Sequence, residues 1–134
     1  MIISELLKTR YVKHGRVIPE LDCWGLAIIA WDKHHGKGIL PSYSHISPDD
    51  KDSLTIAALS VRDEFQFHET ALRDAVIATA WRGRKCDHVG VSVSVDGRIW
   101  ILETDEATGP TLTKPSVFES RYSKVIYYDN QRIS

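Results

Sequence analysis

Residues 87–104 read DHVGVSVSVDGRIWILET, two apolar runs separated by Asp96-Gly97. Both runs show the alternation of period two that is typical of half-buried strands. Asp-Gly between two such runs is a strong signal for a two-residue hairpin turn. The stretch therefore predicts an antiparallel hairpin in which Val95 pairs with Arg98.

This register predicts which side chains share a face. Counting away from the turn, Gly90 faces Glu103 and His88 faces Asp105, so that Glu103 becomes a diagonal neighbour of His88 within side-chain reach. Gly90 has no side chain, and we expect it to let the helix that presents Cys23 approach. A shift of one residue would send Glu103 to the opposite face. That face carries the expected core residues Val89, Val91, Val93, Trp100 and Leu102.

The part of the chain before the hairpin has helical apolar spacing. We expect a short helix over residues 4–10, and a second one that begins at Asp22 or Cys23 and stops near Gly36. A third begins at Ser47-Pro48-Asp49-Asp50 and reaches Asp63 or Glu64. Expected strands cover residues 75–81, 87–95, 98–104 and 125–128. The order of elements predicts an α+β fold, a single domain over residues 1–134, with the helices on one side of an antiparallel sheet.

The composition excludes several classes of partner. The 134 residues carry a formal net charge of −1, from 17 basic and 18 acidic side chains, and no polybasic run. Nothing in this balance indicates binding to nucleic acid or to an anionic membrane. No apolar stretch approaches the roughly 20 residues that cross a bilayer, so we expect no membrane insertion. Residues 1–8 are interrupted by charge too early for a signal peptide, which predicts synthesis and folding in the cytoplasm.

Cys23 stands where a loop turns into a helix, and it is the candidate nucleophile. A thiol attacks as its thiolate, which a helix N-terminus and a positioned imidazole both favour. His88 is the candidate base, and Glu103 the candidate carboxylate that orients it, with Asp105 as the alternative for that third role. We expect the backbone N–H of Cys23 to stabilise an oxyanion.

Neither the cysteines nor the adjacent histidines predict a metal site or a cofactor. Cys86 precedes His88 by two residues, which would place both on one strand face, but no C-x-x-C or H-x-x-x-H partner accompanies them. The adjacent pair His34-His35 would point in different directions from a helix, where it suits the negative end of the dipole. We therefore expect neither a bound metal nor a cofactor.

The motifs together resemble the NlpC-type family of papain-like cysteine peptidases. That family's nucleophile segment reads roughly Y-x-x-G-G-x-x-x-x-G-x-D-C-[SW]-G-[LF], and Tyr11, Gly15 and Asp22-Cys23-Trp24-Gly25-Leu26 match it. Its H-V-G-[IV] strand is matched by His88-Val89-Gly90-Val91. The D-C-W-G-L version, followed by Leu40-Pro41-Ser42-Tyr43, is similar to the branch found in tail-assembly proteins of tailed phages. Residues 117–122 and 125–128 fit that branch too.

The resemblance implies a papain-like fold, N-terminal helices packed on a central antiparallel sheet, and a peptidoglycan hydrolase. Its substrate would be the stem peptide of the bacterial cell wall, and its partners other phage tail or tail-tip proteins. The protein would be made in the bacterial host cytoplasm and incorporated into the virion tail. The resemblance also implies that Tyr11, Asp22 and Trp24 border the substrate groove or the oxyanion pocket.

The sequence departs from the family pattern at three positions. The first family glycine is His14, the glycine before Asp74 is Arg73, and the third polar residue, usually histidine, is Glu103. A carboxylate can still accept a hydrogen bond from the imidazole, so the role is retained. Two alternatives stay open, a tail structural module with little or no turnover and a papain-like amidase or acyltransferase acting on protein or lipid.

Overall fold

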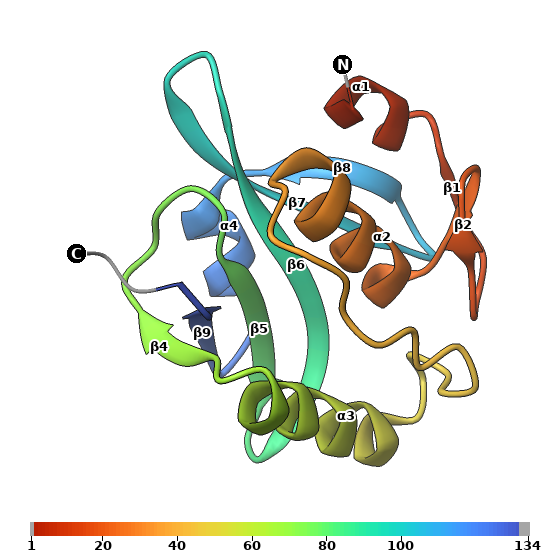
Figure 1. Cartoon of the computed structure of the whole chain (residues 1–134), viewed down its shortest axis with the longest axis vertical. Helices are drawn as coiled ribbons and strands as arrows, with labels where there is room; N and C mark the ends of the chain where they lie inside the picture. The colour runs from red at the N-terminus through yellow and green to blue at the C-terminus, as the bar shows by residue number, and fades with distance from the viewer. Residues whose placement is uncertain (1, 132–134) are drawn as a thin grey trace.

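The computed structural model describes residues 2–131, which form one six-stranded sheet, a small three-stranded sheet and several helices (Figure 1). The six strands lie in the order β4-β9-β5-β6-β7-β8, and all neighbours are antiparallel. Their bounds are β4 (His68–Thr70), β5 (Ile77–Arg82), β6 (Lys85–Val95), β7 (Arg98–Asp105), β8 (Gly109–Thr113) and β9 (Lys124–Asp129). Helices together with a large antiparallel sheet agree with the predicted α+β class.

The remaining elements of residues 2–131 are five helical segments and a small sheet, and Cys23 is the first residue of α2. The helices are α1 (Ile2–Leu6), α2 (Cys23–Ile29), the π-helical turn η1 (Ala30–His34), α3 (Lys51–Glu64) and α4 (Pro115–Ser120). The small sheet contains β1 (Arg10–Tyr11), β2 (Arg16–Val17) and β3 (Glu20–Leu21). The sequence did not predict the small sheet, β4, β8 or α4, and the first helix ends at Leu6, short of the expected residue 10.

The central hairpin has the predicted register. Asp96 and Gly97 have φ angles of +53° and +76°, as the two-residue turn requires, and Val95 pairs with Arg98. Pairing continues as far as Val91 and Leu102. The register prediction is therefore confirmed over the half of the hairpin nearest the turn.

Beyond that point the regular pairing ends, and the predicted pairs of Gly90 with Glu103 and of His88 with Asp105 do not form. β6 stays paired with β5, whereas β7 turns away with β8 (Figure 1). A Cβ on Gly90 would lie 2.8 Å from Cγ2 of Ile101. Gly90 therefore makes room for β7, and not for the Cys23 helix as the sequence analysis expected.

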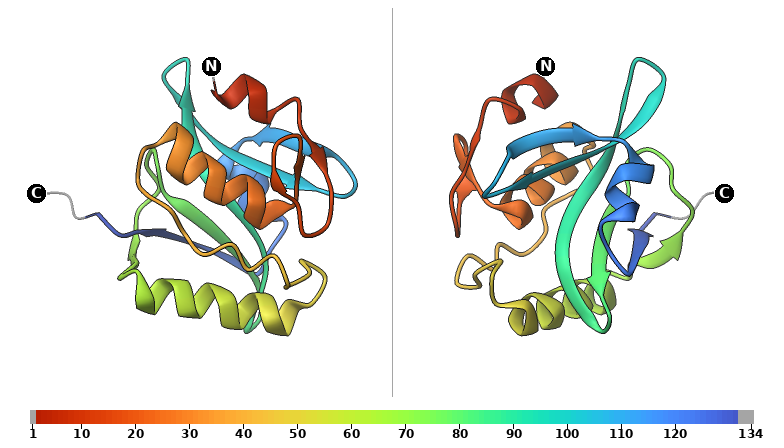
Figure 2. Two further views of the ribbon diagram at one scale, coloured as in Figure 1. Left: turned by 45° about the vertical axis from the view of Figure 1, so that its right-hand side comes forward. Right: turned by 180° about the vertical axis from the view of Figure 1, so that it is seen from behind.

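Both faces of the large sheet are covered, which corrects the prediction that the helices lie on one side. Buried residues of α2, η1 and α3 pack with Val89, Val91 and Val93 in the main core. On the opposite face Phe118 of α4 packs in a second cluster with Ile101. The view from behind in Figure 2 shows α4 over the sheet face turned away from α2.

A bulge separates Cys86 from His88. Trp81 pairs with Cys86 but Ala80 pairs with His88, so that Asp87 is an extra residue on β6. Cys86 and Trp81 accordingly pack in the main core, while His88 lies opposite Ala80 of the second cluster. The expectation that Cys86 and His88 share a face is wrong, because simple alternation does not hold across a bulge.

The capping residues determine where the helices begin and end. The predicted start of α2 is confirmed, and the chain leaves η1 through Gly36, whose φ is +66°. α3 begins later than expected, because its N-cap is Asp50, which accepts from Ser53 N at 3.1 Å. Ser47 instead accepts from Asp49 N at 3.2 Å in the preceding turn. The predicted end of α3 at Glu64 is confirmed.

Asp129 joins the end of β9 to two distant parts of the chain. Its side chain is 4% exposed and contacts Lys37 Nζ at 2.9 Å and Arg73 Nη2 at 2.8 Å. Burial opposes the charged form, but hydrogen bonds from Lys37 and Arg73 outweigh it and lower the pKa of the Asp129 carboxyl. A lowered pKa means that the ion pairs stabilise the fold above about pH 4 and that this stabilisation is lost as the pH falls further.

We therefore expect Asp129→Asn to lower the free energy of unfolding by about 3 kcal/mol at pH 7, because the partly buried cations of Lys37 and Arg73 lose their counter-charge. Urea unfolding followed by circular dichroism measures this difference, which shrinks below pH 4. Asp63→Asn is the matched control, since Asp63 is 71% exposed in its pair with Arg62 and its loss leaves the unfolding curve unchanged. Equal effects of the two substitutions would contradict the assignment.

Candidate catalytic site

Asp22 fixes the start of the helix that carries Cys23. Its carboxylate is fully buried, and Oδ1 accepts from Gly25 N at 2.8 Å as the N-cap of α2. The same oxygen pairs with Arg16 Nη1 at 2.5 Å, and Oδ2 accepts from His14 N at 3.0 Å. One carboxylate thus binds the helix to the preceding loop and places Cys23 as the first residue of the helix.

Two glycines of the motif are explained by close backbone packing. A Cβ on Gly25 would lie 2.1 Å from the carbonyl oxygen of Gly15, and one on Gly15 would lie 2.3 Å from that of Glu20. Both distances are far below van der Waals contact, and the obstructing atoms are backbone. The loop and the first turn of α2 therefore touch directly, and no larger residue fits at either position.

The Leu40-Pro41-Ser42-Tyr43 segment is anchored to the start of α2. Trp24 Nε1 donates to Pro41 O at 2.8 Å. Arg16 Nε donates to Ser42 O at 2.5 Å and its Nη2 to Tyr43 O at 3.1 Å. Trp24 and Arg16 thereby fold the segment against the helix start.

His88 and Glu103 meet as predicted, although their strands are no longer paired there. His88 Nε2 lies 2.9 Å from Glu103 Oε1, and both side chains are almost fully buried. Asp105, the alternative third residue, instead accepts from Ala107 N and Thr108 N, each at 2.9 Å, in the turn after β7. The geometry therefore selects Glu103 over Asp105 as the carboxylate beside His88.

The other side of the imidazole faces Cys23. Because Nε2 is bonded to Glu103, the nitrogen left for the thiol is Nδ1. Burial by itself lowers the pKa of His88, but hydrogen bonds with Cys23 and Glu103 outweigh burial and raise this pKa from 6.5 to about 9. The influence of Cys23 and the hydrogen bond with Glu103 thus favour the imidazolium form of His88 at neutral pH.

Three residues around α4 complete the site, and the sequence analysis assigned a role to none of them. The ring centroid of His88 lies 6.0 Å from that of Phe118 and 6.3 Å from that of Tyr122, whose plane is inclined by 22°. Arg121 Nη2 contacts Glu103 Oε2. Lys114-Pro115 is a recognisable helix start at this point, but nothing local shows that the helix reaches the hairpin.

The three residues expected at the groove or oxyanion pocket differ in exposure and contacts. Tyr11 is partly buried beside the thiol: burial first, and then the charges of Cys23 and Asp22, raise the pKa of its hydroxyl well above the usual value. Trp24 is also partly exposed, with its indole N–H taken by Pro41. Asp22 is enclosed with both oxygens bonded, and so it positions the helix.

The thiol itself has little contact with solvent. Cys23 is 2% exposed and His88 is 8% exposed. This burial strengthens the electrostatic interactions among Cys23, His88 and Glu103, because the local dielectric constant is low. It also means that a substrate carbonyl reaches Sγ only if neighbouring side chains move aside.

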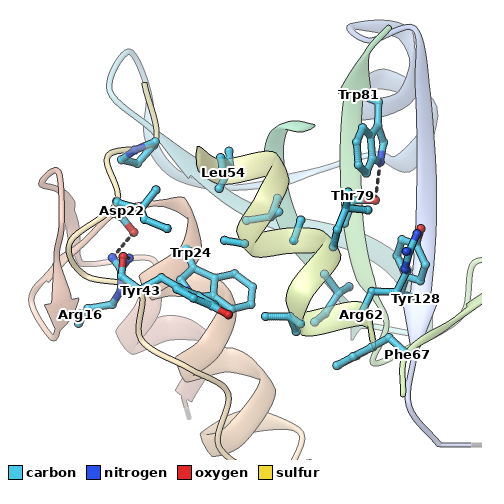
Figure 3. A pocket seen from close by; sticks show the side chains of 18 residues that line it. Arg16, Asp22, Trp24, Tyr43, Leu54, Arg62, Phe67, Thr79, Trp81 and Tyr128 are labelled. Carbon is cyan, nitrogen blue, oxygen red and sulfur yellow. Dashed lines mark hydrogen bonds and ion pairs between the residues drawn. The ribbon is translucent and has the colours of Figure 1, made fainter. Parts of the chain in front are cut away.

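An apolar cleft, partly open to solvent, lies next to these residues between α3, the sheet and the segment after Pro41 (Figure 3). Asp22 and Val89, the chain neighbours of Cys23 and His88, line it. Figure 3 shows the rings of Trp24 and Tyr43 on one side of α3, and Trp81 and Tyr128 on its other side. Cys23, His88 and Glu103 are not among the lining residues, so the cleft adjoins these three candidate residues without containing them.

The second cysteine lies apart from this chemistry. Burial, followed by the charge of Cys23, raises the pKa of the Cys86 thiol to about 12. Over residues 2–131 no group of three or more His, Cys, Asp and Glu side chains has an arrangement that could hold a metal ion. Within the same range no helix is long and apolar enough to cross a bilayer.

No family model, curated protein sequence or solved structure matches this chain.

We expect Cys23 to be alkylated rapidly by iodoacetamide at pH 6 and this labelling to be lost in His88→Ala, because the imidazolium stabilises the thiolate. Rates are measured by mass spectrometry in a Cys86→Ala background. His88→Gln, which keeps a hydrogen-bonding side chain but no charge, serves as a second variant with the same expected loss. Labelling that rises only near pH 8.5, with or without His88, would show an ordinary thiol.

Proposed function

We propose that this protein is a cysteine peptidase that hydrolyses an amide bond through Cys23, His88 and Glu103. The Cys23 thiolate attacks the carbonyl carbon, and the His88 imidazolium gives its proton to the leaving amine as the C–N bond breaks. Water then attacks the thioester, giving its proton back to His88, and the acid product leaves as the thiolate re-forms. The backbone N–H of Cys23 is the oxyanion donor in this proposal.

The observation that carries the proposal is the buried hydrogen bond between His88 and Glu103. Cys23, at the first position of α2, raises the pKa of the same imidazole. Each member has the role that its chemistry suits: a thiol at a helix start, an imidazole with a raised pKa, and a buried carboxylate that holds the ring. A structural histidine needs no thiol at one ring nitrogen and no carboxylate at the other. The arrangement therefore favours nucleophilic chemistry over packing.

For the substrate we propose the stem peptide of peptidoglycan, at the bond between D-glutamate and diaminopimelate or lysine. The support is the resemblance to NlpC-type peptidases in the segments around Tyr11, Cys23 and His88. The structure gives these motif residues a physical reason, since Gly15 and Gly25 permit the close packing and Asp22 caps the helix. A place in a phage tail or tail tip, next to other tail proteins, follows from the same resemblance and is part of the proposal.

A second candidate function is a tail structural module that keeps this fold with little or no turnover. The specific observation in its favour is the burial of Cys23 and His88, at 2% and 8% exposure. A nucleophile that substrate cannot reach would leave the chain of hydrogen bonds as a polar core contact. The two functions differ in whether Sγ becomes accessible in solution.

We expect the wild-type protein to release new amino termini from purified peptidoglycan, and Cys23→Ala to release none. Activity should fall above about pH 9, where His88 loses the proton that the leaving amine needs. In Glu103→Gln the basic limit should move down by about 1–2 pH units, because the carboxylate no longer supports the imidazolium. Amine release and mass spectrometry of the fragments measure both the rate and the bond.

Cys86→Ala is the matched control, since it removes a thiol outside the proposed chain and should leave the pH profile unchanged. No release by the wild type, together with normal assembly of particles that carry Cys23→Ala, would favour the structural module. Release by both wild type and Cys23→Ala would point to a contaminating hydrolase and refute the nucleophile assignment.

A further inference from the structure

We propose that Arg121 is a positioning residue of this catalytic site, which holds Glu103 ionised and aimed at His88. The inference rests on the proposed function and adds a fourth member to its chain. Cys23, His88, Glu103 and Arg121 then alternate in charge from thiolate to guanidinium. Arg121 lies in the segment 117–122 that fits the phage branch, but the resemblance assigns it no role.

The two oxygens of Glu103 have different partners. Oε1 lies 2.9 Å from His88 Nε2, and Oε2 is bonded by Arg121 Nη2. The Glu103 side chain is 3% exposed, whereas that of Arg121 is 37% exposed. Arg121 therefore reaches from the surface and fixes the carboxylate from the side opposite to the imidazole.

Two aromatic rings hold both cations in place. The guanidinium of Arg121 lies 5.2 Å from the ring centroid of Phe118 and 5.6 Å from that of Tyr122. The same rings pack against His88, at 6.0 and 6.3 Å. Because α4 supplies Phe118 and the residues after it supply Arg121 and Tyr122, the position of one short segment sets the geometry of imidazole and guanidinium together.

The charge of Arg121 counters the cost of enclosing Glu103. Burial raises the pKa of this carboxyl, but hydrogen bonds from His88, Thr113 and Arg121 outweigh burial and lower it. Arginine keeps its charge throughout the range in which His88 and Glu103 titrate. Without Arg121 the pKa of Glu103 rises, the carboxylate is protonated at a higher pH, and the imidazolium loses its counter-charge there.

The chain contains a matched control for this effect. Arg82 also stacks on Tyr122, with its guanidinium 5.1 Å from the ring centroid. Its hydrogen-bond partner, however, is Asp87 at 3.1 Å, and not Glu103. Arg82 and Arg121 thus share a ring and a charge but differ in contact with the catalytic carboxylate.

The test is the acid edge of Cys23 alkylation by iodoacetamide, measured between pH 3 and pH 8 in Cys86→Ala protein. We expect Arg121→Gln to move this edge up by about one pH unit, the size of shift that one nearby charge produces. Arg121→Lys, which keeps the charge, should recover at least half of the difference, and Arg82→Gln should leave the edge in place. Arg121→Met, which preserves the aliphatic packing on the two rings, gives the same expected shift if the glutamine variant does not fold.

Repeating Arg121→Gln in a Glu103→Gln background shows whether Arg121 acts through the carboxylate, because no further shift is then expected. An unmoved edge in folded Arg121→Gln or Arg121→Met protein overturns the inference, as does an equal shift without Glu103. Failure of the proposed function looks different: labelling of the parent protein is then independent of His88, and both proposals fall. A lowered melting temperature with an unchanged edge identifies a merely structural arginine.

Discussion

The buried carboxylate of Asp22 is the constraint on which the rest of this site depends. It accepts hydrogen bonds from the first turn of α2 and from the loop before it, and pairs with Arg16. Arg16 in turn binds carbonyl groups of Ser42 and Tyr43. Burying the charge of Asp22 away from water is costly unless hydrogen-bond and ion-pair partners surround it. These partners fix the start of α2, and with it the position of Cys23.

A second constraint acts where the pairing of β6 and β7 ends. A regular hairpin would place His88 opposite Asp105 and would leave Glu103 as a diagonal neighbour at the limit of reach. Where the pairing ends, Nε2 of His88 lies 2.9 Å from Glu103 Oε1, and Arg121 contacts the other oxygen of Glu103. The candidate site therefore lies where the regular pairing of β6 and β7 ends, close to the bulge at Asp87. Such irregularities are common next to functional sites.

The sequence predicted what local chemistry decides. The turn at Asp96-Gly97, the register next to it, the helix start at Cys23 and the contact of His88 with Glu103 all follow from residues close in sequence or paired across one turn. The bulge at Asp87 could not be predicted, because alternation looks the same with or without an extra residue. Arg121 was missed for a different reason: its contact with Glu103 depends on α4 crossing to the second sheet face, which no local pattern encodes.

Enclosure of the thiol links the two functions considered for this protein. In the proposed enzyme the low dielectric around Cys23 and His88 would strengthen a thiolate–imidazolium pair, and the same enclosure would keep substrate out. Thiolate formation and access to Sγ are therefore separate properties. The first is proposed to depend on His88, Glu103 and Arg121, whose side chains contact one another in turn. The second depends on partly exposed groups such as Tyr11 and Tyr122. A chain that kept the first property while losing the second would still carry a reactive thiol, and so reactivity toward a small reagent and turnover of a large polymer have to be measured independently.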